Sequence, residues 1–440
     1  MKFDAVIGNA YGDEGKGLIV DYLSTEETTV VRYCGGAQAG HTVVTPEEHV
    51  LGEDGAPTGA TKEGTGLRHV FHHIGSGTFR GARTYLSRFF ACDPVLFNKE
   101  RDELLALGVS PVVFIDYLAP VVTPFDVLLN QSKEKARLGG VGVHGSCGCG
   151  VGEAFAREET SPATLRVVDL MAPEHLLRAK LDAVQEHVHD TFRESPFLSR
   201  AYTHWRPQEF EGAFANCRQL FLDALPSFLE NTLRTSTTDF FKTGEHFLFE
   251  GAQGLLLDRH IGAFPYVTRA KTGLVNIERI LKEARLDKLH ETTIHFVSRC
   301  YMTRHGAGPL AGELPEFPGD KDSTQKETNT DNPWQGKLRY GPYDASLLDW
   351  ARTRALAEVG EVGEIKIVTT CLDHITGSDQ TLDLGMGISV RASKSIIEKD
   401  DASEAPGVPD MEGQNRTKES FYFGSSLVST GPTRDDVEEL

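Results

Sequence analysis

Short segments dominated by apolar residues recur along the chain, bounded by glycine or polar residues. Segments of this length and composition predict strands that are buried on both faces, as in a parallel sheet. The candidates are Ala5–Ile7, Val30–Val31, Pro111–Ile115, Phe247–Phe249, Ile294–Val297 and Ile365–Val368.

Segments with helical spacing of apolar residues lie between these strands. A helix is expected over Leu18–Leu23, and another from Asn98, which can cap its first turn, to Leu107 before Gly108. A third is expected over 344–359. A stripe at helical spacing is formed by Leu177, Leu181, Val184 and Val188. The alternation predicts an α/β fold with a mainly parallel central sheet and flanking helices.

The organisation along the chain is simple. Residues 1–440 are expected to form a single elaborated domain, with a mostly helical insertion around 171–240. Two stretches, 46–66 and 399–419, are rich in glycine, proline and acidic residues and have no apolar period, so we expect exposed loops there.

Charge and composition exclude several classes of protein. The 440 residues contain 64 acidic and 45 basic side chains, a net charge of −19, which disfavours binding to nucleic acid. No apolar run approaches the ~18 residues of a membrane span, and the N-terminus has no secretory apolar region. The seven scattered cysteines suit a reducing cytoplasm. A cytoplasmic protein without nucleic-acid or membrane partners is therefore expected.

The first candidate for chemistry is the glycine-rich turn Gly8–Gly17, which follows the first strand. Its backbone N–H groups can converge on a phosphate, as in a P-loop, and Lys16 can neutralise it. Gly17 stands where a P-loop has a magnesium-binding Ser or Thr, so Asp13 is the candidate metal ligand. The same glycine argues against a GTPase switch.

A second glycine-rich turn, Arg32–Thr42, presents His41 after the second strand. A histidine beside phosphates can act as a general acid or stabilise charge, although a lone histidine is more often structural. Elsewhere, Cys147 and Cys149 form a C-x-C without a second cysteine or histidine pair, so we do not expect zinc there.

Segments that run in order along most of the chain resemble adenylosuccinate synthetase, the ligase that joins L-aspartate to a 6-oxopurine nucleotide. They are Gly12–Gly17, Ala39–Thr42, Phe249–Gly254, Leu256–Asp258, Pro265–Thr268, Thr303–Arg304, Gly306–Pro309, Glu313–Leu314 and Ser429–Pro432. The resemblance implies that a nucleoside triphosphate phosphorylates the purine 6-oxygen and that the aspartate amine then displaces the phosphate. Asp13 would take the N1 proton, His41 would stabilise the moving charge, and Lys16 would neutralise phosphates.

The resemblance also implies three binding sets and a magnesium site. The triphosphate set is Gly12, Glu14, Gly15, Lys16, Gly17, Gly40, His41, Thr42, Asp373, Ser429 and Gly431. The purine monophosphate set is Asp13, Gln38, Ser146, Cys147, Gln253, Thr268 and His305. The aspartate set is Gly336, Lys337 and Arg339, and the Mg²⁺ ligands are Asp13 and the Gly40 carbonyl.

Departures from the family pattern favour its viral branch, which converts (d)GMP to N6-succino-2-amino-(deoxy)adenylate for 2-aminoadenine DNA. Gln38 stands where housekeeping members have Asn, and the segments His69–Thr78 and Thr84–Ser87 are more similar to the viral branch. Viral members often have Ser in place of Asp13, so IMP, giving adenylosuccinate, stays the alternative substrate. A viral enzyme would act in the host cytoplasm.

The phosphate donor and the assembly are less defined. Cys371 replaces the family's lysine in the guanine-binding segment, so the donor is expected to be GTP, ATP or dATP. The resemblance implies a homodimer in which an arginine crosses between active sites, and Arg157 or Arg166 is the candidate. A catalytically inactive nucleotide-binding regulator is the alternative of a different class.

Overall fold

The structure is a computed structural model of the chain. It describes residues 1–45, 49–51, 57–61, 66–137, 145–196, 198, 207–317, 334–375, 381–383, 389–391, 420–423 and 426–430. Side chains are described for these residues except 49–51, 57–61, 207–210, 373, 375 and all those beyond 380.

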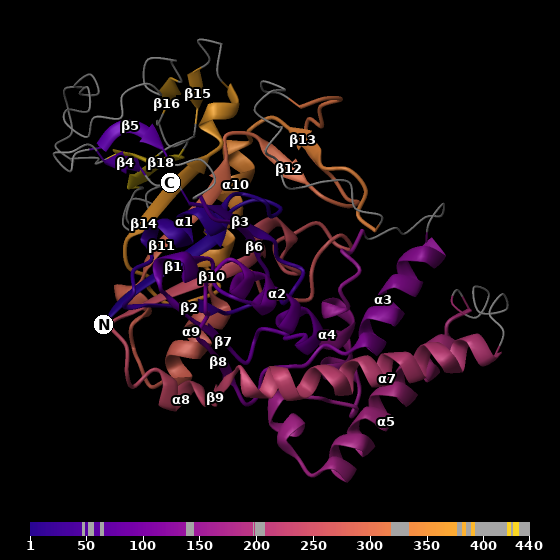
Figure 1. Cartoon of the computed structure of the whole chain (residues 1–440). Coiled ribbons are helices and arrows are strands. Elements are labelled where there is room, and N and C mark those ends of the chain that lie inside the picture. The colour runs from indigo at the N-terminus through magenta and orange to yellow at the C-terminus, as the bar shows by residue number, and fades with distance from the viewer. Residues whose placement is uncertain are drawn as a thin grey trace.

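The strands and helices alternate along most of the chain (Figure 1). The strands are β1 Lys2–Gly8, β2 Thr28–Arg32, β3 His41–Val44, β4 His49–Leu51, β5 Pro57–Thr61, β6 Arg68–Phe71, β7 Arg83–Leu86, β8 Val113–Asp116, β9 Leu233–Thr235, β10 His246–Gly254, β11 Thr293–Arg299, β12 Met302–Arg304, β13 Arg339–Gly341, β14 Ile365–Thr370, β15 Thr381–Asp383, β16 Ser389–Arg391, β17 Ser420–Phe423 and β18 Ser426–Thr430. The α-helices are α1 Lys16–Leu23, α2 Pro94–Ala106, α3 Pro124–Arg137, α4 Val151–Thr160, α5 Glu174–Glu194, α7 Pro207–Glu230, α8 Thr237–Phe240, α9 Val275–Glu283 and α10 Ala345–Leu356. The short 3₁₀ turns are η1 Ser76–Arg80, η2 Val167–Met171, η3 Leu255–Leu257, η4 Leu289–Glu291 and η6 Leu372–Ile375.

A ten-stranded sheet in the order β17-β18-β14-β11-β1-β10-β2-β7-β8-β9 forms the centre of the fold. The strands from β14 to β9 pair in parallel, and β18 and β17 add an antiparallel edge. Because the strands are parallel, their carboxyl ends share one edge of the sheet, where ligands bind in folds of this class. The predicted α/β fold with a mainly parallel sheet is confirmed.

Both faces of the sheet are buried by apolar side chains. On one face Phe3 and Ile7 of β1 belong to a buried cluster with Ile277 of α9, and on the other Val6 belongs to a cluster with Ile19 of α1. Each fully buried side chain of this kind stabilises the fold by about 1.5–3 kcal/mol. Burial on both faces explains why these strands have no alternation of apolar and polar residues.

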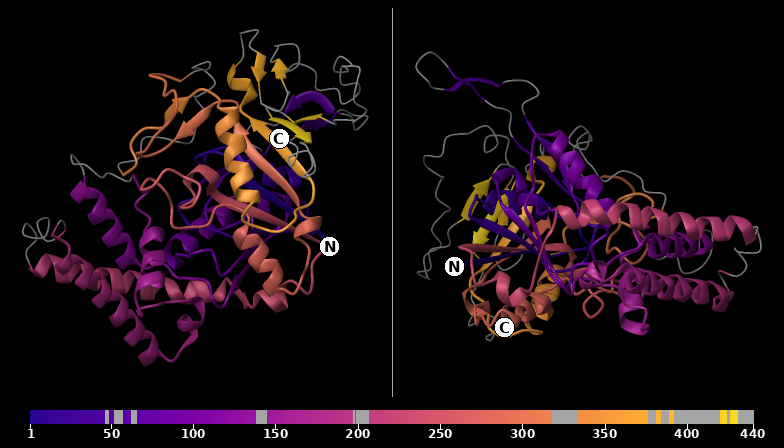
Figure 2. Two further views of the ribbon diagram at one scale, coloured as in Figure 1. Left: turned by 180° about the vertical axis from the view of Figure 1, so that it is seen from behind. Right: turned by 60° about the horizontal axis from the view of Figure 1, so that its bottom comes forward.

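Helices α5 and α7 lie side by side and extend away from the sheet (Figure 2). The stripe Leu177, Leu181, Val184 and Val188 is buried on α5, in one cluster with Phe221 of α7. The division of the chain into one domain with an insertion stays a prediction. Among the described residues, no helix is long and apolar enough to cross a bilayer.

Two sequence expectations are corrected by the structure. Asn98 lies inside α2 and donates to the carbonyl of Ala224. The helix is capped five residues earlier, by Asp93, whose side chain accepts from Val95 N and Leu96 N. Proline at the first helical position makes this earlier start favourable. Within the stretch 46–66, the described residues include β4 and β5, which pair antiparallel and are strands where loops were expected. The stretch 399–419 lies outside the described residues.

Candidate active site

A cavity of about 1290 Å³ opens at the carboxyl edge of the sheet. Its walls come from the turns that follow β1, β2, β10, β11 and β14, together with the start of α4. Of the predicted triphosphate set, Gly12, Gly15, Lys16, Gly17, Gly40, His41 and Thr42 line it. All of the predicted monophosphate set line it as well: Asp13, Gln38, Ser146, Cys147, Gln253, Thr268 and His305. The fold thus brings residues from 12 to 305 into one cavity.

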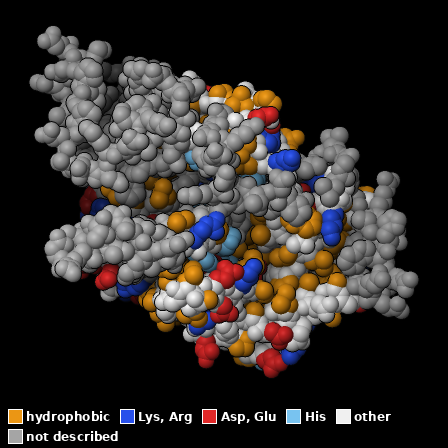
Figure 3. All heavy atoms as spheres, turned by 45° about the horizontal axis from the view of Figure 1, so that its top comes forward, with side chains coloured by type: hydrophobic (Ala, Val, Ile, Leu, Met, Phe, Trp, Pro, Cys, Tyr) orange, Lys and Arg blue, Asp and Glu red, His pale blue; other side chains and the backbone are white. Residues whose placement is uncertain are grey.

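The lining carries an excess of positive charge. Seven Lys or Arg side chains line the cavity against three Asp or Glu side chains, although the whole chain has a net charge of −19. Five histidines also line it. On the face shown in Figure 3, histidine side chains lie near the middle, with Lys, Arg and hydrophobic side chains around them. A cavity of this size and charge suits phosphorylated ligands.

The turn after β1 is held by a buried glutamate. Glu14 Oε1 accepts from the N–H groups of Ala10 (3.1 Å) and Gly12 (2.8 Å), and its Oε2 pairs with Lys16 Nζ at 2.6 Å. Burial opposes the charged form of Glu14, but the Lys16 ammonium beside it lowers the pKa of the carboxyl. Glu14 therefore stabilises the conformation of the turn without lining the cavity, whereas Lys16 lines it.

Asp13 stands at the tip of this turn in the left-handed conformation, with φ of 64°. The Nε of Arg299 donates to its carbonyl oxygen at 2.5 Å, and His305 Nε2 lies 3.9 Å from its Oδ2. Burial raises the pKa of the Asp13 carboxyl, while the charges of His305 and Arg299 oppose that rise. A carboxyl with a raised pKa at the mouth of a cavity is suited to taking up a proton.

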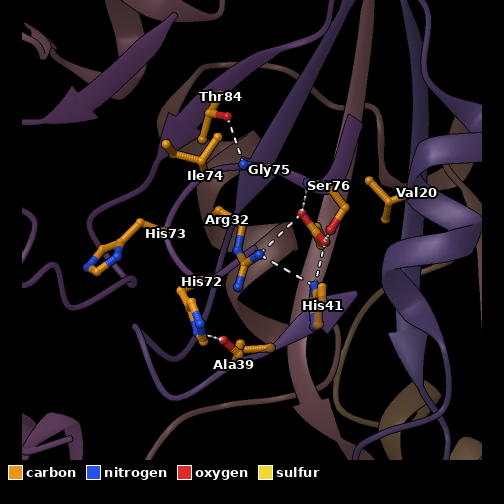
Figure 4. Close-up of polar contacts among 12 residues, drawn as sticks. Val20, Arg32, Ala39, His41, His72, His73, Ile74, Gly75, Ser76 and Thr84 are labelled. Carbon is orange, nitrogen blue, oxygen red and sulfur yellow. Dashed lines mark hydrogen bonds and ion pairs between the residues drawn. The ribbon is translucent and has the colours of Figure 1, made fainter. Parts of the chain in front are cut away.

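His41 is oriented by a buried carboxylate (Figure 4). Its Nδ1 donates to Glu250 Oε1 at 2.5 Å, and Glu250 also accepts from Ser76 N and Oγ and pairs with Arg32 at 3.3 Å. Burial lowers the pKa of His41 to about 4, and Glu250 opposes this shift. For Glu250, the charges of Arg32 and His41 overcome burial and lower the pKa to about 2. The Nε2 of His41 is left as an acceptor.

Five buried polar atoms of cavity residues have no hydrogen-bond partner among the described residues. They are Gln38 Oε1, His41 Nε2, Glu134 Oε2, Gln253 Oε1 and His305 Nδ1. An unpaired buried polar atom costs about 1–3 kcal/mol, so a ligand that pairs with these atoms gains affinity. Their distribution over five separate places in the chain indicates one polar ligand that reaches across the cavity.

The loop before α4 forms another wall. Ser146 Oγ accepts from Asn130 Nδ2 at 2.8 Å, and Asn130 Oδ1 accepts from Gly150 N at 3.1 Å. Gly150 takes a left-handed conformation as the N-cap of α4, and no side chain caps the helix. Because the first N–H groups of the helix lack a side-chain partner, this end of the cavity is suited to an anion such as a phosphate.

The model of one protein family, adenylosuccinate synthetase, matches residues 5–380. The chain belongs to the adenylosuccinate synthetase family. Members of this family are ligases that form a C–N bond, so the predicted enzyme class and the resemblance are confirmed.

Adenylosuccinate synthetases with similar sequences occur in bacteria. That of Methylibium petroleiphilum is 28% identical over 404 residues, covering 91% of this chain and 82% of that protein. That of Chromohalobacter salexigens is 32% identical over 313 residues, covering 70% of this chain and 64% of that protein. The solved, fully ligated synthetase of Plasmodium falciparum has a TM-score of 0.63 at 19% identity, covering 86% and 79% of the two chains, and shares the fold. Cyanophage S-2L succinoaminodeoxyadenylate synthetase bound to dGMP and dATP aligns with a TM-score of 0.49 at 21% identity, covering 83% of both chains.

The predicted aspartate set lies apart from the lining of this synthetase's cavity. Gly336, Lys337 and Arg339 are not among the lining residues. The guanidinium of Arg339 pairs with Glu313 and donates to the carbonyls of residues 306 and 308. Arg304, which sequence analysis did not single out as a site residue, does line the cavity, with its guanidinium over the Tyr11 ring.

Three of the predicted triphosphate-binding residues lie wholly or partly outside the described residues. Ser429 is on β18 and pairs with Ile367 of β14, and Asp373 is on η6, but the side chains of both lie outside the described residues. Gly431 also lies outside them. Cys371, which precedes η6, lines the cavity.

Arg157 is not available as an arginine that crosses to another synthetase subunit. It is fully buried, pairs with Asp126 at 3.1 Å and donates to the carbonyls of Val121 and Ala163. All three nitrogens of its guanidinium donate inside the fold, which makes the burial favourable. Arg166 is 39% exposed and pairs with Glu158.

Sequence analysis missed the residues that orient the histidines. Glu250 falls within the segment Phe249–Gly254 that resembles the family, but neither it nor Ser76 or Arg32 is assigned a role from the sequence. Glu100 likewise accepts from the N–H groups of His72, His73 and Ile74, fixing the turn that carries His72 into the cavity. The one sequence clue was an acidic residue within an otherwise apolar strand, FLFEG.

Proposed function

We propose that this chain joins L-aspartate to C6 of a 6-oxopurine nucleoside monophosphate, using a nucleoside triphosphate, and that its preferred purine substrate is (d)GMP. The observation that carries the proposal is the His41–Glu250 pair, which leaves a buried Nε2 without a partner in a cavity also lined by Asp13 and Lys16. A purely regulatory nucleotide-binding protein has no need for a charge-oriented histidine in the same cavity as a carboxyl with a raised pKa.

The two steps follow from the chemistry of these groups. Oxygen at C6 is a poor leaving group, so the γ-phosphoryl group is first transferred to it, and the aspartate amine then displaces phosphate. Asp13 takes the N1 proton of the purine, which makes the 6-oxygen a better nucleophile. His41, protonated when an anionic phosphate is close, donates from Nε2 to the charge that moves between the γ-phosphate and the 6-oxygen, while Glu250 stabilises the imidazolium.

Magnesium fits the residues present. Among the described residues, no group of three or more His, Cys, Asp or Glu side chains could hold a metal by itself. Mg²⁺ needs only one or two protein oxygens when it is bound together with substrate phosphates. Asp13 and the Gly40 carbonyl, both in the lining, would supply these oxygens, and the ion would neutralise charge on the phosphates.

The preference for (d)GMP is supported by the acceptor capacity of Asp13. A carboxylate can accept two parallel hydrogen bonds, and guanine presents N1–H and the 2-amino group side by side. IMP, which lacks the 2-amino group, would use one of them. IMP is the second candidate because the bacterial relatives are named adenylosuccinate synthetases.

The donor is proposed to be GTP, with ATP and dATP as alternatives. Asp373 would accept from guanine N1–H and the 2-amino group of GTP. Cys371 lines the cavity where a longer side chain would pack over the base, which leaves room for a different purine. We also propose that the enzyme is a homodimer, which light scattering of the purified chain would test.

The experiment is a matrix of assays with L-aspartate and Mg²⁺, in which IMP, GMP and dGMP are each paired with GTP, ATP and dATP. Phosphate release and the mass of the product are measured. We expect product with dGMP and GMP. No phosphate release in any pairing would refute the ligase function, and product from IMP alone would refute the substrate preference.

Site variants then test the roles. Asp13→Asn is expected to abolish product formation while nucleotide binding stays measurable. The matched control is Asp102→Asn, which removes a 70% exposed carboxylate on α2 and is expected to keep the wild-type rate. A wild-type rate in Asp13→Asn would show that this carboxyl does not handle the N1 proton.

A further inference from the structure

Two cysteines separated by one glycine form part of the cavity wall just before α4. Cys147 and Cys149 are both half-buried, and both line the cavity. Gly148 between them has φ of +77°, and the Sγ of Cys149 lies 3.9 Å from the carbonyl oxygen of Cys147. The left-handed glycine thus turns the chain so that the second thiol points back toward the first residue.

The Cys147 thiol differs in acidity from its neighbour Cys149 and from two cysteines elsewhere in the chain. A hydrogen bond from the Cys149 thiol lowers the pKa of Cys147, because it stabilises the thiolate. The shared proton in turn raises the pKa of Cys149. Burial instead raises the pKa of Cys34 and Cys217 to about 11. Since the thiolate is the nucleophile, Cys147 is the better candidate for reaction with an electrophile than those two.

We propose that Cys147 and Cys149 are a reversible oxidation site, at which a peroxide converts the two thiols to a disulfide and thereby inactivates the enzyme. The Cys147 thiolate attacks one peroxide oxygen, the O–O bond breaks, and the released hydroxide takes a proton to become water. The resulting sulfenic acid is attacked by Cys149, an S–S bond forms, and the S–O bond breaks to release a second water. The peroxide gains the two electrons and two hydrogens that the thiols lose.

A disulfide would hold the two sulfurs about 2.05 Å apart, in a small ring closed over a single glycine. The loop is held in place by Gln131 Nε2, which donates to Gly148 O at 3.3 Å, and by the Trp334 ring against Gly148, where an added Cβ would lie 2.8 Å from Cδ1. Closing the ring pulls against both contacts.

The consequence reaches the proposed substrate site through α4. Gly150, the N-cap of α4, is one residue beyond Cys149, and its N–H donates to Asn130. Movement of the loop therefore shifts the helix N-terminus and the cavity wall together. A shift of about 1 Å in a positioning group can lower turnover by about 10²-fold. This loss of turnover rests on the proposed function, whereas the thiol chemistry does not.

The test treats the purified chain with hydrogen peroxide and follows two independent quantities. Mass spectrometry of the peptide that contains both cysteines reports the loss of two hydrogens, and the ligase assay reports turnover before and after treatment. We expect the peptide to lose two hydrogens, turnover to fall by about 10²-fold, and dithiothreitol to restore both.

Cysteine variants distinguish oxidation of the Cys147–Cys149 pair from oxidation of the other thiols. The activity of each variant after treatment is compared with its own activity before treatment. Cys149→Ser is expected to stop at the sulfenic acid of Cys147, which dimedone traps, and Cys217→Ser, on α7 outside the cavity, is expected to respond like wild type. A wild-type peptide whose mass is unchanged when other cysteines are oxidised would overturn the proposal. So would a disulfide that forms fully and leaves turnover unchanged. An untreated protein without ligase activity would count against the proposed function instead, because the mass measurement still tests the thiol pair.

Discussion

Glu250→Gln removes one negative charge from beneath His41 while leaving the size of the side chain nearly unchanged. In the structure, the carboxylate accepts from His41 and Ser76 and pairs with Arg32, and it is fully buried. The substitution therefore leaves a buried guanidinium without its counter-ion and a histidine without the charge that stabilises its protonated form.

The magnitude follows from the distances. At an effective dielectric constant of about 20, unit charges separated by the 3.3 Å between Arg32 and Glu250 attract each other by about 5 kcal/mol. Breaking a buried ion pair by removing one partner costs about 3–5 kcal/mol of folding free energy. The loss of an oriented general acid lowers turnover by about 10²–10⁴-fold. Glu250→Gln is expected to show both effects, with KM for the nucleotides changed much less than kcat.

The assay combines urea unfolding with steady-state kinetics of the folded variant. Ser76→Ala is the matched control, because it removes one hydrogen bond to Glu250 and keeps the charge. We expect it to lose about 1.5–3 kcal/mol of stability and to keep kcat within about tenfold of wild type. A folded Glu250→Gln enzyme with kcat within about tenfold of wild type would refute the role assigned to the pair.

Three further predictions follow from single contacts. His41 titrates near 4 when folded and near 6.5 when unfolded, so the unfolded chain binds more protons between these values and stability falls as the pH is lowered through that range. Thermal unfolding at several pH values should show that the free energy of unfolding falls by about 2 kcal/mol between pH 7 and 5, and that this fall is missing in His41→Asn. Equal falls in both proteins would contradict the prediction. Asp126→Asn leaves the buried Arg157 without its partner and should cost about 3–5 kcal/mol in urea titration, whereas a loss below about 1 kcal/mol would show that the pair adds little. Gly148→Ala forces a side chain into a left-handed backbone position against Trp334. Calorimetry should therefore show weaker binding of the mononucleotide and a loss of about 1–2 kcal/mol in stability. Unchanged binding would show that the loop does not shape the site.

Local sequence patterns predicted the framework and the glycine-rich turns, whereas the resemblance to the family supplied most of the predicted residues that line the cavity. The apolar segments Phe247–Phe249 and Ile294–Val297 became β10 and β11 because burial on both faces is visible in composition alone. Glycine-rich turns after strands also predicted correctly where the chain bends sharply, as at Asp13 and Gly15, both with positive φ. These features depend on residues close together in the chain.

Pairing between distant residues could not be predicted in this way. His41 and Glu250 are 209 positions apart, and their contact depends on β2 and β10 being neighbours in the sheet. Arg157 was a candidate for an arginine that crosses between subunits, but Asp126 on the adjacent α3 pairs with it and makes burial favourable. In both cases the partner is a charged side chain, and the topology of the fold sets its position. A single sequence carries little information about that topology.

The same distinction explains how an acidic chain can bind the phosphates of the proposed ligands. The cations of the cavity are already engaged, since Lys16 pairs with Glu14, Lys133 pairs with Glu153, and Arg304 donates to backbone carbonyls. An anionic ligand must therefore exchange partners with them, and its affinity is the difference between two sets of contacts. Glu14 keeps its bonds to the N–H groups of the turn whether or not Lys16 leaves it, so the turn retains its shape while the ammonium moves. That division of roles makes phosphate affinity local and independent of the −19 net charge, which still repels larger polyanions.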